Sequence, residues 1–162
     1  MKSYNILFLC TGNSARSILA EALVTTLSHG KFIGYSAGSN PSGRVNPFAF
    51  ELAMALGYPK EKLRSKNWDE YSSPDSPQMD FIITVCDNAA NEVCPVWLGH
   101  PSTAHWGFPD PASVEGTDAI KREVFKKTLL ALKKNIEALI KLPIDQLDSS
   151  SLKKAIQDIH HA

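Results

Sequence analysis

The segment from Tyr4 to Leu27 constrains the fold of this chain more than any other. Tyr4 to Leu9 is a short apolar run that ends at the turn-forming residues 11–14. From Ser17 onward, apolar residues recur at spacings of three and four, which is the pattern of an amphipathic helix. A buried strand, a turn and a helix in direct succession are typical of proteins in which helices cover a parallel sheet.

The same alternation continues along the chain. Three further strands are predicted at residues 31–36, 81–85 and 103–106, and two further helices at residues 47–56 and 117–141. The first of these helices has a clear start, because Asn46 can cap it and Pro47 suits its first position. Pro143 ends the last one. These elements predict an α/β fold with a parallel sheet covered on both faces.

The length and the charge balance limit the class of protein. With 162 residues the chain fits one domain, which we assign to residues 1–142, followed by a polar tail at residues 143–162 with a weak helical pattern. Lysine and arginine number 17, as do aspartate and glutamate. A balanced charge argues against a general nucleic-acid or membrane binder, but it leaves a local anion site open.

The three cysteines, Cys10, Cys86 and Cys94, indicate a reducing compartment. A secreted disulfide scaffold usually has more of them and an even number. The apolar run before Cys10 is too short for a secretory signal or a membrane span. We therefore expect a cytoplasmic protein.

Cys10 and Arg16, separated by five residues, form the sharpest motif. A loop between a strand and a helix can turn its backbone N–H groups toward one anion, and the start of the helix adds a positive end. Arg16 can offer a two-pronged contact to a tetrahedral oxyanion. The same donors favour a thiolate, so Cys10 is predicted to be a nucleophile with a lowered pKa. The expected oxyanion-binding residues are Thr11, Gly12, Asn13, Ser14, Ala15, Arg16 and Ser17. A chance cysteine and arginine in a turn is the alternative, and the position between a strand and a helix argues against it.

Two further signals are weaker when taken alone. Asp110 lies between two prolines, which suits a positioned general acid, although Asp-Pro is also a common turn. Cys86 and Cys94 are eight positions apart, and free cysteines are often just buried small residues. A metal site is disfavoured, because no Cys-x2-Cys or histidine pair supports it. Cys10 and Cys86 each follow a predicted strand, so both are expected at one edge of the sheet.

Together these residues resemble the low-molecular-weight tyrosine phosphatase superfamily, and within it the arsenate reductase branch. The resemblance covers about residues 4–141 and rests on residues 6–17, 35–38, 46–47, 85–86, 94–95, 105–107 and 110–111. It implies a three-layer sandwich with a four-stranded parallel sheet flanked by helices. It also implies that the phosphatase-type loop after the first strand binds phosphate, sulfate or arsenate.

Within the superfamily, the resemblance favours an oxidoreductase over a hydrolase. Phosphatases usually have aromatic residues after Asp-Pro, whereas this chain has Ala112 and Ser113. Cys86 and Cys94 match the relay thiols of the reductases. The implied function is arsenate reduction in arsenical resistance, through Cys10 and a redox-active Cys86–Cys94 disulfide, with Asp110 as the acid. The alternatives are a phosphatase that forms a phosphocysteine at Cys10, an activity the reductase can also retain, and an oxyanion sensor without catalysis.

The resemblance also bears on partners and metals. Thioredoxin, or glutaredoxin with glutathione, is the implied reductant; thioredoxin-coupled relatives typically place the last two cysteines one residue closer than here. Some relatives bind potassium, and Asn13, Glu21 and Ser36 match that site. The position of its aspartate is occupied by Lys66, whose ammonium can take the place of the ion. We therefore expect neither a metal nor a cofactor.

The tail lies beyond the resemblance. Leu152, Ile156 and Ile159 form an apolar stripe, which we predict packs on the domain rather than against a partner. His160 and His161 are predicted to be a solvated end. His105 is predicted to pack or to form hydrogen bonds rather than act as a base.

Overall fold

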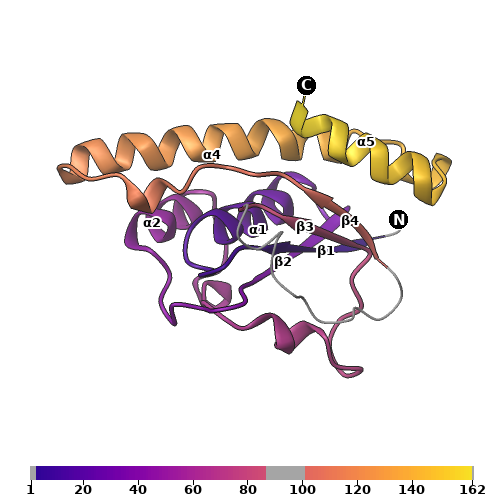
Figure 1. Ribbon diagram of the computed structural model, residues 1–162, viewed down its shortest axis with the longest axis horizontal. Coiled ribbons are helices and arrows are strands. Elements are labelled where there is room, and N and C mark those ends of the chain that lie inside the picture. Colours follow the sequence, from indigo (N-terminus) through magenta and orange to yellow (C-terminus); the bar gives the residue numbers. More distant parts are fainter. Residues whose placement is uncertain (1–2, 87–100, 162) are drawn as a thin grey trace.

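Four parallel strands form the sheet at the centre of the molecule (Figure 1). The computed structural model describes residues 3–86 and 101–161. The strands are β1 (Tyr4–Leu9), β2 (Phe32–Ala37), β3 (Phe81–Thr84) and β4 (Ser102–His105), and their order in the sheet is β2-β1-β3-β4. Each predicted strand is present within one or two residues of its expected bounds. The predicted parallel α/β architecture is therefore confirmed.

The α-helices are α1 (Arg16–Leu27), α2 (Pro47–Ala55), α4 (Asp118–Ile140) and α5 (Ser149–His161). The first three begin within one residue of their predicted starts, whereas the weak pattern of the tail predicted no start for α5. The Asn46 side chain accepts a hydrogen bond from the Phe48 N–H at 2.9 Å, as expected of a cap. Thr117 caps α4 in the same way, with its hydroxyl 3.3 Å from the Ile120 nitrogen.

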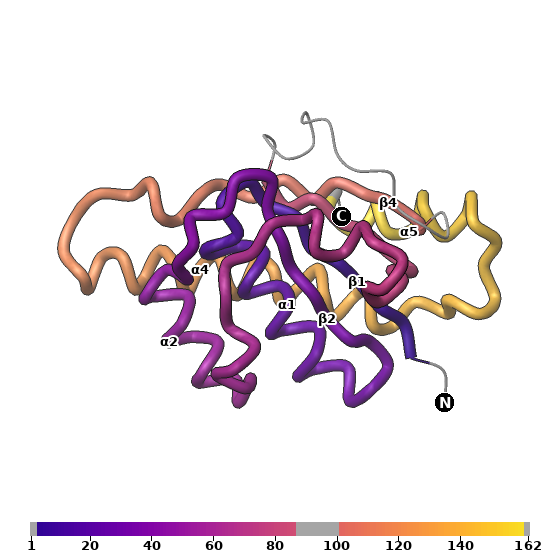
Figure 2. The backbone as a smooth tube through the Cα atoms, turned by 90° about the horizontal axis from the view of Figure 1, so that it is seen from below, coloured from indigo at the N-terminus to yellow at the C-terminus, as the bar shows by residue number. Residues whose placement is uncertain are grey.

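Alternate residues of β1 belong to two hydrophobic cores, one on each face of the sheet. Ile6 and Phe8 face the helices and belong to the larger core, which also contains Phe125 of α4. Leu7 and Leu9 face the opposite side, where they pack with residues of the segment 58–79. That segment holds the short 3-10 helices η1 (Lys60–Lys62) and η2 (Trp68–Tyr71), and it crosses in front of the sheet in Figure 2. The sheet is thus covered on both faces, by α-helices on one and by this segment on the other.

The tail packs on the domain, as predicted, and it does so at the edge strand β4. Helix α5 lies along β4, and its residues Leu152 and Ile156 are buried. The indole N–H of Trp106 donates to the backbone oxygen of Ile156 at 2.9 Å, within the core. The helix is longer than the weak sequence pattern indicated, because its apolar stripe gains stability from this tertiary contact rather than from propensity.

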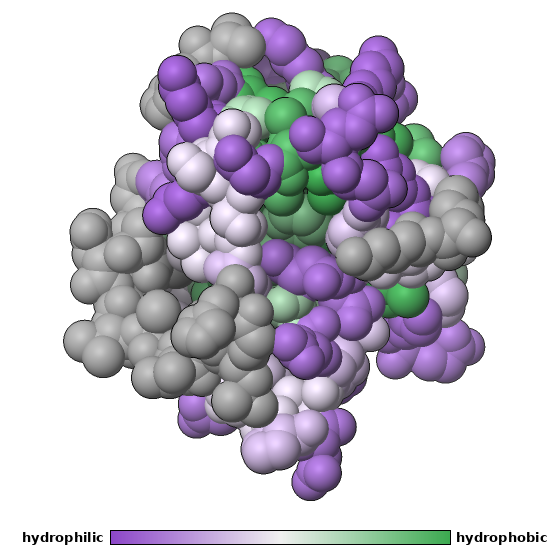
Figure 3. All heavy atoms as spheres, turned by 90° about the vertical axis from the view of Figure 1, so that its right-hand side faces the viewer, coloured by the Kyte–Doolittle hydropathy of each residue, from purple (hydrophilic) through white to green (hydrophobic). Residues whose placement is uncertain are grey.

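Hydrophilic side chains surround a smaller hydrophobic patch on the face shown in Figure 3. None of the helices in residues 3–86 and 101–161 is long and apolar enough to cross a membrane.

Candidate active site

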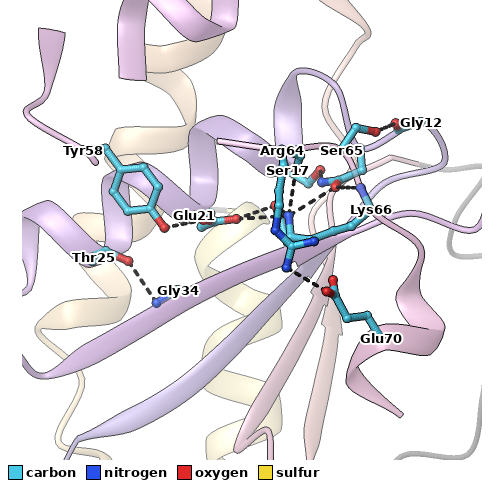
Figure 4. Close-up of polar contacts among 12 residues, drawn as sticks. Gly12, Ser17, Glu21, Thr25, Gly34, Tyr58, Arg64, Ser65, Lys66 and Glu70 are labelled. Carbon is cyan, nitrogen blue, oxygen red and sulfur yellow. Dashed lines mark hydrogen bonds and ion pairs between the residues drawn. The ribbon is translucent and has the colours of Figure 1, made fainter. Parts of the chain in front are cut away.

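The loop that joins β1 to α1 is anchored to neighbouring segments through its carbonyl groups. Its backbone oxygens at Thr11, Gly12 and Ser14 accept hydrogen bonds from the N–H groups of Asn40, Ser42 and Asn46, at 3.0, 3.0 and 2.8 Å. Ser65 adds a hydroxyl contact to the Gly12 oxygen at 3.1 Å (Figure 4). These contacts tie the carbonyl groups of the loop to neighbouring segments, which suits a loop whose N–H groups bind an anion.

The start of α1 adds positive potential to the same place. Ala15 is the capping residue, and its side chain makes no capping hydrogen bond. The N–H groups of Ser14 and Ala15 have no acceptor within the described part of the chain. Uncapped N–H groups and the helix dipole together favour an anion here.

Gly38 allows β2 to approach this loop closely. A Cβ atom at Gly38 would lie 2.4 Å from the Thr11 oxygen and 2.6 Å from the Cys10 oxygen. Only glycine fits at that distance without moving the backbone.

Arg16 lies beside Asp110, so the structure brings together two residues of the predicted site. Its Nη1 donates to the Phe108 oxygen at 2.7 Å, and its Nη2 is 4.0 Å from Asp110 Oδ2. Its Nε is buried and has no partner among the described residues. A buried N–H without an acceptor is costly, so this donor is well suited to an oxyanion in the loop. Asp110 is about half exposed, with 46% of its side chain accessible.

Cys10 and Cys86 meet at the carboxyl ends of the two central strands, β1 and β3. Cys10 follows β1 and Cys86 follows β3, and these two strands are paired in parallel. Both side chains are buried, and the Thr11 N–H donates to Cys86 Sγ at 3.3 Å. The expected juxtaposition of the two thiols is therefore confirmed. Cys94 lies outside the described residues.

The pKa of Cys10 shifts in the opposite direction to the sequence prediction. A hydrogen bond with Cys86 and burial raise this pKa, and they outweigh the Arg16 guanidinium and the Gly12 N–H, which lower it. The sequence indicates the donors of the loop, which favour a thiolate at Cys10. It does not show the burial of Cys10 or its contact with Cys86, which oppose the thiolate.

Replacing Cys86 with alanine is therefore expected to lower the pKa of Cys10. The substitution removes the largest cause of the raised value and leaves Arg16 in place. At about pH 7, a larger fraction of Cys10 is then thiolate, so it is alkylated faster. The pH dependence of Cys10 alkylation, measured in a Cys94→Ser background with and without Cys86→Ala, tests this. An unchanged or higher pKa in the variant would contradict the assigned cause.

Lys66 and Glu21 form a buried polar cluster behind the loop (Figure 4). Lys66 Nζ lies 3.3 Å from Asn13 Oδ1, 3.2 Å from Ser36 Oγ and 3.6 Å from Glu21 Oε1. The Lys66 ammonium thus occupies the position among these three residues that the sequence comparison assigned to it. No group of three or more metal-ligating histidine, cysteine, aspartate or glutamate side chains occurs in residues 3–86 and 101–161.

This cluster supports the unusual backbone of Asn13. Asn13 has a positive φ of 44°, and its side chain donates to Ser17 Oγ at 2.8 Å. Its oxygen accepts from the Lys66 backbone N–H at 2.9 Å, as well as from the ammonium. Burial raises the pKa of Glu21 and lowers that of Lys66, while each partner opposes the shift of the other.

Lys66→Met is expected to destabilise the fold by about 3 kcal/mol, because it leaves a buried carboxylate without its cation. The raised pKa of Glu21 means that the folded state holds this proton more tightly than the unfolded state, so the contribution of Glu21 to stability falls as pH rises. Removing Lys66 raises that pKa further. The loss should therefore be larger at about pH 8 than at about pH 5.

Urea unfolding at the two pH values measures the effect, with the exposed Lys62→Met as the matched control. Equal stability losses in the two variants would show that the cluster contributes little.

Several contacts of the site were not predictable from sequence. The Phe108 carbonyl that binds Arg16 carries no sequence signal. Tyr58, whose hydroxyl donates to Glu21 Oε2, lies 37 positions away. The prediction of a solvated end was wrong for His160, whose ring packs on Phe108 with centroids 4.9 Å apart. The prediction for His105 is confirmed, since its Nδ1 is 2.6 Å from the Thr84 hydroxyl.

Comparison with known proteins gives one family. The pattern of the low molecular weight phosphotyrosine protein phosphatase family matches residues 5–157. The match extends into the tail, beyond the range of about 4–141 that the motifs indicated. An arsenate reductase of Halalkalibacterium halodurans is 36% identical over 132 residues, which cover 82% of this chain and 91% of the relative.

Solved structures agree on the architecture. The crystal structure of an arsenate reductase from Archaeoglobus fulgidus is similar with a TM-score of 0.59 and 27% identity, covering 82% of this chain and 98% of that one. A low molecular weight protein tyrosine phosphatase from T. tengcongensis has a TM-score of 0.67 at 22% identity, covering 90% of this chain and all of its own. The latter likeness concerns the fold alone.

Proposed function

Because the chain belongs to the low molecular weight phosphotyrosine protein phosphatase family, we propose that it is an arsenate reductase of that family. One observation carries the proposal: a second buried thiol, Cys86, lies beside Cys10 at the anion loop. Hydrolysis of a phosphate ester has no step for this thiol, whereas reduction of an oxyanion needs one. Relatives from Halalkalibacterium halodurans and Bacillus subtilis, 36% and 34% identical to this chain, are named arsenate reductases.

In the first step, Cys10 attacks the arsenic of arsenate bound in the loop. The loop N–H groups and Arg16 hold the oxyanion and stabilise the negative charge that develops on it. An arsenic–oxygen bond breaks, and Asp110 supplies a proton to the departing oxygen. Because the pKa of Cys10 is raised before substrate binds, the thiol proton passes to the departing arsenate oxygen as the sulfur–arsenic bond forms. With the proton from Asp110, this oxygen leaves as water.

In the second step, Cys86 attacks the sulfur of Cys10. The sulfur–arsenic bond breaks and its electron pair remains on arsenic, which is thereby reduced from the +5 to the +3 state. Arsenite leaves, and a disulfide joins Cys10 and Cys86. Their burial at adjacent strand ends favours this reaction, because the two sulfurs meet without a large rearrangement of the sheet.

Cys94 completes the cycle in this proposal. It attacks Cys86, which frees Cys10 as a thiolate, and a dithiol protein such as thioredoxin then reduces the Cys86–Cys94 disulfide by exchange. Glutaredoxin with glutathione is the alternative reductant. The cytoplasm is the compartment in which such partners keep thiols reduced, and release of arsenite there would serve arsenical resistance.

Phosphomonoester hydrolysis is the second candidate function, since Cys10, Arg16 and Asp110 also suit a phosphocysteine mechanism. The residues that follow Asp110 argue against phosphotyrosine as the main substrate. Pro111–Ser113 forms the 3-10 helix η3, in which Ala112 and Ser113 are exposed and present no aromatic wall. We expect a weak residual phosphatase activity.

A single assay separates the two functions. Arsenite release from arsenate is measured with the thioredoxin and the glutaredoxin systems supplied separately, beside hydrolysis of a phosphotyrosine peptide. We expect arsenite formation with at least one reductant and slow peptide hydrolysis. Efficient hydrolysis with no arsenite under either reductant would reverse the assignment.

A further inference from the structure

The backbone segment from His105 to Asp110 carries the acid and holds the arginine of the site. On one side it is fixed to the end of β3: the Trp106 N–H donates to the Thr84 oxygen at 2.7 Å, and the Phe108 N–H donates to the Val85 oxygen at 3.0 Å. Its Phe108 oxygen in turn accepts from Arg16 Nη1 at 2.7 Å. The position of this segment therefore decides where the guanidinium lies.

Helix α5 fixes the opposite side of the same segment. Gln157 bonds both backbone groups of His105, accepting from its N–H at 2.9 Å and donating to its oxygen at 2.7 Å. His160 Nε2 lies 3.0 Å from the Gly107 oxygen, and its ring packs edge-on against Phe108. Gln157 and His160 thus bond the backbone of the segment just before Phe108, whose oxygen contacts Arg16.

The partners of His160 define its tautomer. A carbonyl oxygen can only accept, so Nε2 carries the proton and donates it to Gly107. Nδ1 then accepts from Asn135 Nδ2 of α4, at 3.0 Å. The imidazole thereby connects the two long helices to the backbone of the active-site segment.

From these contacts we propose that His160 is a positioning residue of the oxyanion site. It acts through Gly107 and Phe108 to hold the Arg16 guanidinium and the Asp110 carboxylate in place. Gln157 supports the same segment through His105, two residues before Gly107. The inference rests on the proposed function, because it assigns His160 a role in binding the oxyanion and in its reaction.

Three substitutions at His160 separate its hydrogen bond from its packing. His160→Ala removes both, and His160→Phe keeps a ring against Phe108 but removes the donor. His160→Gln retains an N–H donor at a similar reach. The exposed Lys154→Ala on the same helix is the control for a change of sequence in α5.

Two readouts are measured in the full-length chain: the Kd of inorganic phosphate and the KM and kcat for arsenate. In His160→Ala and His160→Phe, we expect Kd and KM to rise roughly fivefold, the effect of one net hydrogen bond. His160→Gln and Lys154→Ala should stay within about twofold of the wild type. Should His160→Ala fail to fold, the Phe and Gln variants still decide the question.

Unchanged Kd and KM in the Ala and Phe variants would overturn the proposal, even if the melting temperature falls, because packing alone would then explain the residue. An equal rise in His160→Gln would also overturn it, since the donor is kept there. Failure of the proposed function gives a different result: the wild type would bind phosphate but release no arsenite, and the phosphate Kd values would still test His160.

Discussion

Arg16→Lys is expected to lower kcat/KM for arsenate by roughly 10²- to 10³-fold, although the positive charge is kept. The Arg16 guanidinium has three nitrogens in different surroundings. Nη1 bonds the Phe108 oxygen, Nη2 lies near Asp110, and Nε is a buried donor without a partner among the described residues, which leaves it for an oxyanion. A lysine has one nitrogen at the end of a flexible chain and cannot make these contacts together. The affinity for phosphate should fall as well.

The matched control is Arg122→Lys, which makes the same chemical change at an exposed ion pair with Glu51. Steady-state arsenate kinetics and the phosphate Kd are measured for both variants. Near-normal values for Arg16→Lys would show that the guanidinium is not the group that holds the oxyanion. A similar loss in both variants would point to a general effect on the fold.

Cys86→Ser is expected to abolish turnover, because no other thiol among the described residues lies beside Cys10 to displace arsenic. Without arsenite release, no disulfide should form at Cys10. Cys94→Ser should fail at a later point. It is expected to release about one arsenite per enzyme and to stop as a Cys10–Cys86 disulfide, since only the following exchange requires Cys94.

Peptide mapping by mass spectrometry after alkylation identifies these species. The wild type, treated with arsenate and no reductant, should accumulate the Cys86–Cys94 disulfide. Continuous turnover of Cys94→Ser with glutathione would contradict the relay and make Cys94 a bystander. Arsenite release by Cys86→Ser at the wild-type rate would remove Cys86 from the mechanism altogether.

Local sequence determined the elements and the centre of the site. The apolar run Tyr4–Leu9, the cap at Asn46 and the period of residues 117–141 each depend on neighbours in the chain, and such signals are readable without a fold. Placing Cys10 and Cys86 at one edge followed from strands that end there, because parallel strands share an edge. The loop from Cys10 to Arg16 was predictable for the same reason.

Tertiary structure alone decided the properties that depend on distant residues. The pKa of Cys10 is raised rather than lowered, because burial and the Cys86 contact outweigh the Arg16 guanidinium. The size of each effect depends on distances between atoms, which the spacing of residues in the sequence does not give. The apolar stripe of the tail predicts that it packs on the domain, but no local pattern indicates that His160 bonds Gly107 across 53 positions. Residue types along the chain thus fixed which groups are available for the chemistry, whereas packing fixed their protonation, their neighbours and their geometry.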